Sequence, residues 1–433
     1  MSDAAASFII GVGHRARSTP SAGRQAVDVA ALDALDALQR DPYPHYARAR
    51  RRDGLIYVGE LDAWLVARYA DVQEVLNRPS DFSSAKAMRP DATPSPAALS
   101  ELAKGVSGSS IVLTSDGARH RRLREPHTRG MSTARVITLI PFITERVAAL
   151  IDGFAADGGV ELMGAYAERL PGEVIGRLLG LAPHDVPGAV HAGRRAEQLL
   201  FRPLDPDDQA AAARDYVALQ HLMDDYARRR RTEPRADLCT DMIRALCPGS
   251  AQPTDSDRGD LVATLVNVLL AGHLTTAALI GTAVLHLLRH RDQWELLCEH
   301  PELIPQAVEE AARFDAPVQG FRRVATRDVE LAGTRLPAGS ELFVAFGSAN
   351  RDEALCDRPD TFDVTRTGVR HLAFGHGVHS CPGVRLARAQ VRITLETLTR
   401  RLPGLRLAPG WDGAVTMRPT LIHRSPEMLP LVW

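Results

Sequence analysis

The chain has 433 residues, of which 45% are hydrophobic and 24% charged, a composition typical of a globular protein with a large core. Lys and Arg total 52 and Asp and Glu total 53, for a formal net charge of −1. This balance excludes a global electrostatic attraction to nucleic acid or to an anionic membrane surface. The five cysteines are scattered, without the spacing of a zinc site or a disulfide scaffold. We therefore expect the protein to be located in a reducing cytoplasm.

In chain order, residues 1–40 lack a clear periodic pattern, and we expect a loosely ordered segment there. Residues 55–69 alternate between apolar and polar side chains like two strands of a hairpin. Residues 85–115 are rich in Pro, Ser, Gly and Ala, which is typical of a long loop. Long loops in compact folds are often functional.

Helical patterning dominates residues 120–310, and residues 317–346 return to short strands with turns. No linker or repeat divides the chain, so we predict one large, mainly α domain with small β sheets over residues 41–433. The apolar stretch 261–272 is interrupted by Thr264 and Asn267 and is shorter than the roughly 20 residues that cross a bilayer. We therefore expect a buried helix and no membrane association.

The strongest motif is HLAFGHGVHSCPGVRLARAQ, residues 371–390. Glycines there permit a tight backbone turn, and Pro382 suits the first position of a helix. Cys381 would then lie at a helix N-terminus, where free N–H groups favour the thiolate over the thiol. The motif residues at fixed offsets are Phe374, Gly375, Gly377, His379, Cys381 and Gly383.

This motif resembles the heme loop of the cytochrome P450 family, and the resemblance extends from about residue 41 to the C-terminus. It implies the cytochrome P450 fold, heme b as cofactor and Cys381 as the ligand of its iron. It also implies a monooxygenase that uses O2 to hydroxylate or epoxidise a small organic molecule, which we expect to be a secondary metabolite.

Glu310 and Arg313 are three residues apart and so share one helical face. Such a pair is often a solvated surface pair that contributes little. The resemblance instead implies a buried network that braces the heme core. Arg358 and Arg366 are the candidates for a third partner.

Arg and His side chains are suited to binding the two heme propionates. The resemblance assigns this role to His120, Arg124, Arg323, His371 and His379.

The apolar helix expected around residues 261–288 resembles the family's central helix, which passes over the iron. Ala271 and Gly272 would leave space for O2, although Gly272 alone would be an ordinary packing glycine. Thr275 would present its hydroxyl on the oxygen side, with Thr276 beside it. The family usually has an acid immediately before this threonine, whereas this chain has Leu274, which cannot carry a proton.

Two outcomes stay open because of Leu274. In the first, ordered water, Thr276 or the substrate supplies the protons, which leaves hydroxylation or epoxidation intact. Alternatively, the enzyme couples or desaturates its substrate. Further alternatives are peroxide-driven oxidation, gas binding, and a cysteine-nucleophile enzyme in which His376 or His379 is the base. A cysteine-nucleophile enzyme would give Glu310 and Arg313 no function.

The other cysteines lack iron–sulfur spacing, so we expect electrons from a separate ferredoxin and ferredoxin reductase. Arginines 121, 122, 385 and 388 are candidates for a basic patch that binds an acidic ferredoxin, or for a solvated arginine face. We expect an apolar or aromatic substrate, although core residues show the same apolar pattern. The predicted substrate contacts are Met88, Val106, Leu200, Val268, Val318, Phe321 and Met417.

Overall fold

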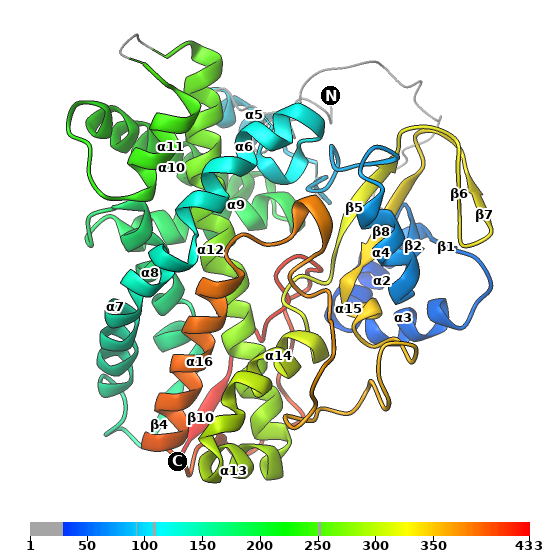
Figure 1. Cartoon of the computed structure of the whole chain (residues 1–433), viewed down its shortest axis with the longest axis vertical. Helices are drawn as coiled ribbons and strands as arrows, with labels where there is room; N and C mark the ends of the chain where they lie inside the picture. Colours follow the sequence, from blue (N-terminus) through cyan, green and yellow to red (C-terminus); the bar gives the residue numbers. More distant parts are fainter. Residues whose placement is uncertain (1–28, 92, 107–109, 250–252) are drawn as a thin grey trace. The chain divides into compact units, whose positions relative to one another are not determined.

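The computed structural model describes residues 29–91, 93–106, 110–249 and 253–433 (Figure 1). These residues are mainly helical, with small β sheets, as predicted. Most of the predicted N-terminal segment, residues 1–28, lies outside the described residues, whereas residues 29–40 form helix α2. The domain boundary at residue 40 stays a prediction.

The described residues form two compact units, and each unit is built from separated stretches of the chain. The unit that contains Cys381, which we name the cysteine unit, comprises residues 29–82, 136–171 and 274–433. The other, the helical unit, comprises the described residues within 83–135 and 172–273. Because the chain passes repeatedly between them, neither unit is a continuous sequence domain.

The helices of the cysteine unit are α2 (Val29–Arg40), α3 (Tyr43–Arg50), α4 (Tyr69–Asn77), most of α7 (Thr133–Asp152), α13 (Arg291–Glu299), α14 (Ile304–Phe314), α15 (Phe346–Ala349) and α16 (Val384–Arg401). Short helical turns are η1 (Gly59–Leu61), η3 (Met163–Ala167), η4 (Pro301–Leu303) and η5 (Gly377–His379). The strands are β1 (Ile56–Val58), β2 (Ala63–Val66), β3 (Phe82–Ser83), β4 (Gly159–Glu161), β5 (Gly320–Ala325), β6 (Val329–Leu331), β7 (Thr334–Leu336), β8 (Glu341–Ala345), β9 (Arg406–Leu407) and β10 (Pro430–Val432).

The largest sheet has the strand order β1-β2-β8-β5-β3. The predicted hairpin is its antiparallel β1–β2 pair, in which Tyr57 lies opposite Trp64. Strand β8 alternates between two core clusters: Leu342 belongs to one and Phe343 to the other. The sheet is therefore buried on both faces, as the period of two in a strand requires.

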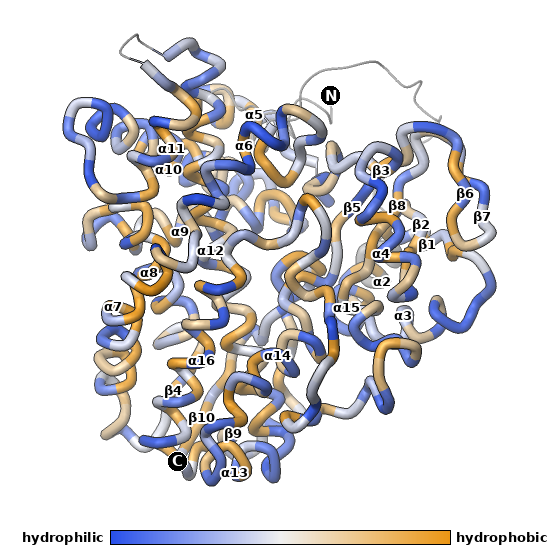
Figure 2. The backbone as a smooth tube through the Cα atoms, in the orientation of Figure 1, coloured by the Kyte–Doolittle hydropathy of each residue, from blue (hydrophilic) through white to orange (hydrophobic). Residues whose placement is uncertain are grey.

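Helices α14 and α16 run side by side, and α16 carries the last residues of the motif (Figure 1). Hydrophobic and hydrophilic residues are interspersed along both helices (Figure 2). In α14, Ile304, Ala307, Val308 and Ala311 recur at helical spacing and are all buried, which fixes one face of the helix in the core.

The helical unit contains α5 (Pro96–Leu102), the turn η2 (Val112–Thr114), α6 (Gly117–Gly130), most of α8 (Arg169–Leu179), α9 (Val186–Phe201), α10 (Pro206–Thr232) and α11 (Leu238–Leu246). The prediction of a continuous loop over residues 85–115 was wrong, because α5 lies within it. Ser95 caps this helix: its hydroxyl accepts a hydrogen bond from the Ala98 N–H at 3.2 Å, and Pro96 occupies the first turn. Helix α5 then packs on α10.

Helix α12 (Asp255–Arg289) is the long central helix. It is the one described helix that is long and apolar enough to cross a membrane, but 78% of its most apolar window is buried inside the structure. Burial within the protein accounts for its apolar composition without a membrane, as expected from the sequence.

Candidate functional site

The Cys381 loop is closed by its own backbone. The Cys381 N–H donates to the Phe374 carbonyl oxygen at 2.8 Å. Gly375 and Gly377 have φ of 69° and 68°, a region that favours glycine. A Cβ at Gly377 would also lie 2.8 Å from the Leu76 carbonyl oxygen. Two glycines are thus needed for the loop's conformation.

Helix α16 begins at Val384, with Gly383 as its N-cap. The expectation that Pro382 occupies the first helical position was wrong, because Gly383 adopts φ −86° and ψ 5° and separates Pro382 from the helix. Cys381 is three residues from the first helical residue. Its side chain is partly accessible, whereas Cys239 and Cys247 are buried.

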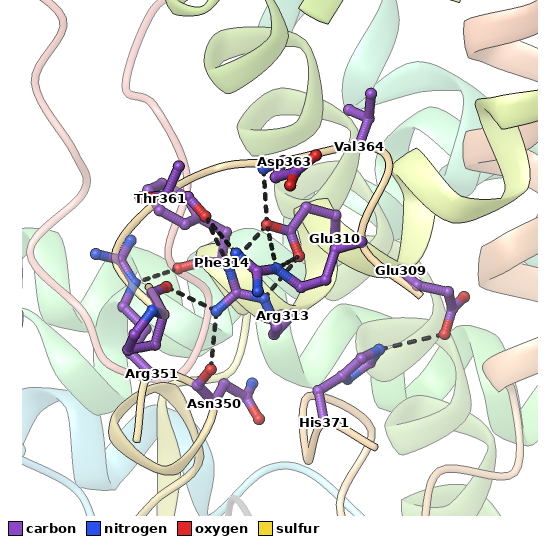
Figure 3. A network of polar contacts seen from close by, with 12 residues as sticks. Glu309, Glu310, Arg313, Phe314, Asn350, Arg351, Thr361, Asp363, Val364 and His371 are labelled. Carbon is purple, nitrogen blue, oxygen red and sulfur yellow. Dashed lines mark hydrogen bonds and ion pairs between the residues drawn. The ribbon is translucent and has the colours of Figure 1, made fainter. Parts of the chain in front are cut away.

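Glu310 and Arg313 form a buried charge pair on α14 (Figure 3). The Arg313 Nε and Nη2 donate to the two Glu310 carboxylate oxygens at 2.6 and 2.7 Å. The Asp363 N–H donates to the same carboxylate at 2.9 Å. The Arg313 guanidinium also donates to the carbonyl oxygens of Asn350, Pro359 and Thr361. The pair thereby joins α14 to the irregular segment 350–366.

Arg366, rather than Arg358, brings a third charge to this pair. The Arg366 Nε lies 3.4 Å from the Glu310 carboxylate. Arg358 instead contributes its carbonyl oxygen, which accepts from Arg366 at 3.2 Å. Arg358 has φ 45°, so its backbone turns at this point.

His371 contacts α14 through a residue that sequence reasoning missed. Its Nε2 lies 3.2 Å from the Glu309 carboxylate, and its Nδ1 accepts from the Ala373 N–H at 3.3 Å (Figure 3). The proton is therefore on Nε2, and a propionate would have to share it with Glu309. The propionate role of His371 stays a prediction.

The remaining predicted propionate partners are divided between the units. In the cysteine unit, Arg323 is buried on β5 and donates to the Arg322 carbonyl oxygen at 2.8 Å, and His379 ends η5. In the helical unit, His120 and Arg124 lie one turn apart on α6. Burial lowers the pKa of His120, helped by the Arg124 charge, so this imidazole is neutral at neutral pH.

Helix α12 is mostly buried in its apolar part but has accessible positions around residues 267–275. Asn267, Ala271 and Thr275, spaced four residues apart, are exposed or partly exposed, whereas Leu274 and Thr276 are buried. A Cβ on Gly272 would lie 2.5 Å from Cδ1 of Ile175 on α8. Gly272 therefore has a packing role within the helical unit, and its role towards O2 stays a prediction.

The predicted substrate contacts are not brought to one site by any described contact. Leu200 and Val268 are buried in the helical unit, as core residues would be, and Met88 and Val106 are partly buried there. In the cysteine unit, Val318 and Phe321 pack against the sheet core. The Met417 carbonyl oxygen accepts from Arg40 at 2.8 Å.

Two of the four candidate docking arginines are already paired. Arg388 binds Glu309, and Arg122 binds Asp257 at 2.9 Å. Arg121 and Arg385 are exposed and remain the candidates for a docking surface.

The comparisons with known proteins agree on one family. Residues 196–403 match the family model "Cytochrome P450". The chain is 35% identical over 404 residues to vitamin D(3) 25-hydroxylase of Pseudonocardia autotrophica, covering 90% of this chain and 93% of the relative. It is 34% identical over 388 residues to mycinamicin IV hydroxylase/epoxidase of Micromonospora griseorubida, covering 86% and 90%. Its fold is similar to that of cytochrome P450 CREJ in complex with (4-ethylphenyl) dihydrogen phosphate, with a TM-score of 0.85, 28% identity, and coverage of 91% and 98%.

The fold and the cysteine loop define a heme-thiolate oxidoreductase. The chain belongs to the cytochrome P450 family. It is a monooxygenase that binds heme b, and the predicted mainly α fold is confirmed.

The residues of the cysteine unit fit this cofactor. Gly375 and Gly377 keep the loop free of side chains, so a flat ring can approach its backbone. Cys381 is a partly accessible residue at the end of this loop, and the buried Arg323 offers a cation suited to a carboxylate.

Proposed function

We propose that this chain is a ferredoxin-dependent monooxygenase that hydroxylates or epoxidises a small apolar or aromatic secondary metabolite. The names of two relatives support this class of reaction, since one is a vitamin D(3) 25-hydroxylase and the other a mycinamicin IV hydroxylase/epoxidase. The observation that carries the proposal is the loop before α16, where two glycines with positive φ precede the partly accessible residue Cys381.

Each predicted site residue has one task in this proposal. Cys381 binds the iron as a thiolate, and the N–H groups after Pro382 surround its sulfur. Bound heme supplies the iron at which O2 is activated. Arg323 and His379, and on α6 His120 and Arg124, neutralise or hydrogen-bond the propionates.

Thr275 is the proposed oxygen-side alcohol, because it lies among the accessible positions of α12. Leu274 cannot relay a proton to it, and its side chain is packed in the core with 7% exposure. Protons must therefore come from water, from Thr276 or from the substrate. The alternative outcome is substrate coupling or desaturation, which stays open because the residue before Thr275 is Leu274 rather than an acid.

Electrons come from a separate ferredoxin and its reductase in this proposal. Arg121 and Arg385 are exposed charges suited to an acidic partner. We place the enzyme in the cytoplasm, supported by the burial of α12.

The first experiment is the absorption spectrum of the reduced, carbon monoxide-bound protein. We expect the long-wavelength band of thiolate-bound heme in the native chain and its loss in Cys381→Ala, with Cys239→Ala as the control cysteine. Retention of that band in Cys381→Ala would exclude Cys381 as the ligand.

The second experiment distinguishes the reactions. Ligands are first screened for a shift of the heme from low to high spin, and the best of them is turned over under 18O2 with ferredoxin and reductase. One labelled oxygen in a single product supports monooxygenation, whereas an unlabelled coupled or desaturated product rejects it. Turnover with peroxide but not with reduced ferredoxin rejects the proposed electron source.

A further inference from the structure

Glu309 connects the two flanks of the Cys381 loop. Its carboxylate lies 3.2 Å from the His371 Nε2, ten residues before the cysteine. The same carboxylate accepts two hydrogen bonds from Arg388, on α16 after the cysteine, at 2.6 and 2.5 Å. One side chain on α14 therefore holds both the entry to the loop and the helix that follows it.

The two partners of Glu309 meet again at Phe374. The Arg388 guanidinium carbon lies 5.1 Å from the centroid of the Phe374 ring, and the His371 ring centroid lies 5.9 Å from it. The Phe374 carbonyl oxygen accepts the Cys381 N–H at 2.8 Å. A movement of either partner is thus transmitted through Phe374 to the backbone of the cysteine.

The contacts of Glu309 are separate from the Glu310–Arg313 pair. Adjacent helical residues point about 100° apart, given 3.6 residues per turn. Glu310 accordingly faces Arg313 and Asp363, whereas Glu309 faces His371 (Figure 3). The structure assigns no part of the loop's flanks to Glu310.

The carboxylate of Glu309 carries its charge at ordinary pH. Burial raises its pKa, but hydrogen bonds from His371 and Arg388 outweigh burial and hold the pKa at about 2. His371 is fixed at both nitrogens, because its Nδ1 accepts from the Ala373 N–H. Its side chain is only 5% exposed, so it has little freedom to turn elsewhere.

We propose that Glu309 is a positioning residue for the heme ligand: by binding His371 and Arg388 together, it clamps the Cys381 loop against α14. This inference rests on the proposed role of Cys381. Losing the clamp leaves the cysteine in place but lets the loop open more often, so heme escapes faster.

The alternative role for Arg388 is a surface cation that only docks an acidic ferredoxin. Its side chain is 42% exposed, so it is accessible to a partner. The two roles differ in their consequences: a clamp affects heme retention with no partner present, whereas a docking cation affects only reduction by the partner.

The test compares Glu309→Gln with the native holoenzyme. Glutamine keeps the length of the side chain and removes its charge. The control is Glu295→Gln, which breaks an exposed pair with Arg291 at 2.9 Å on the neighbouring α13. The measurements are the rate of heme transfer to excess apomyoglobin and hydrogen exchange of peptides spanning residues 371–388.

We expect heme transfer to be about tenfold faster in Glu309→Gln, the effect of losing charge-assisted hydrogen bonds in a partly exposed site. Exchange of peptides spanning residues 371–388 should also increase, while Glu295→Gln matches the native protein. A Glu309→Gln protein that retains heme and protects the loop like the control would overturn the proposal.

Arg388→Gln provides a second test. We expect it to speed heme transfer as Glu309→Gln does, and the double variant to be no faster than either single variant, because both remove the same contact. Normal heme transfer in Arg388→Gln, with slower reduction by ferredoxin only, would assign Arg388 to docking and reject the clamp.

The Cys381→Ala variant distinguishes failure of the proposed function from failure of the clamp. If the thiolate spectrum persists in Cys381→Ala, the proposed function itself fails. If that spectrum is lost in Cys381→Ala while Glu309→Gln behaves like Glu295→Gln, only the clamp fails.

Discussion

Substitutions around Arg313 should rank by burial and geometry. Glu310→Gln removes the negative charge that faces the Arg313 guanidinium, whose side chain is 1% exposed. An unpaired buried cation costs about 3–5 kcal/mol of unfolding free energy. We expect Glu310→Gln to lose this amount of unfolding free energy, because the other groups that accept hydrogen bonds from Arg313 are neutral carbonyl oxygens.

Arg366→Gln should cost less, about 1 kcal/mol. Its contact with Glu310 is long, at 3.4 Å, and its other hydrogen bonds are to the neutral carbonyl oxygens of Asp357, Arg358 and Thr361. Arg358→Gln is the matched control and should change stability by about 0.5 kcal/mol or less, because Arg358 joins the network through its backbone.

The assay is urea unfolding of the three variants at equal heme saturation, followed by tryptophan fluorescence, with heme content measured alongside. Equal saturation is needed because a ligand that binds the folded state adds to apparent stability. The expected order of destabilisation is Glu310→Gln, then Arg366→Gln, then Arg358→Gln. If Arg358→Gln destabilised as much as Arg366→Gln, the assignment of the third partner would be wrong.

Three further predictions test packing, pH dependence and the heme ligand. Gly272→Ala should lower the free energy of unfolding in urea by about 1 kcal/mol, because crowding of Ile175 outweighs the better helix propensity of alanine. If the effects of Gly272→Ala and Ile175→Ala on this free energy were additive, the contact would be refuted. Burial lowers the pKa of His127 to about 4, below the unfolded value of about 6.5, so the unfolded chain binds a proton that the folded chain does not. The free energy of unfolding should therefore fall by about 2 kcal/mol from pH 7 to pH 5. His127→Leu should remove this component, and an unchanged dependence of stability on pH in that variant would contradict it. Pro382→Ala adds an N–H donor near the sulfur. It should raise the heme reduction potential by about 40 mV, which corresponds to a hydrogen bond of about 1 kcal/mol. An unchanged or lower potential in a redox titration would contradict the added hydrogen bond.

Two control variants test whether the effects on stability and on the heme potential are specific to His127 and Pro382. His300 is an exposed histidine paired with Glu302, so His300→Gln should leave the free energy of unfolding at pH 7 nearly unchanged. For the potential, Pro409→Ala changes an exposed proline outside the cysteine loop and the Arg313 network, and it should have no effect.

The elements that could be predicted from the sequence are those whose determinants lie close together in the chain. The β1–β2 hairpin follows from alternation within residues 55–69, and α12 follows from one long apolar run. Helix α5 had an equally local signal, Ser95 followed by Pro96. Composition obscured this signal, because the same residues are typical of loops.

The partners of the charged residues on α14 could be found only in the tertiary structure. Arg358 and Arg366 are equivalent in the sequence, and the backbone turn at Arg358 helps to decide which guanidinium reaches Glu310. Glu309 looks like any charged helical residue, since its partners lie 62 and 79 residues away.

The sequence by itself determined the family and singled out the proposed iron ligand, because the cysteine, its glycines and the start of the following helix are encoded within twenty consecutive residues. Only the tertiary structure decided which side chains support that loop. Contacts between distant segments depend on how helices α14 and α16 and the segment between them pack, and local sequence carries no record of that packing.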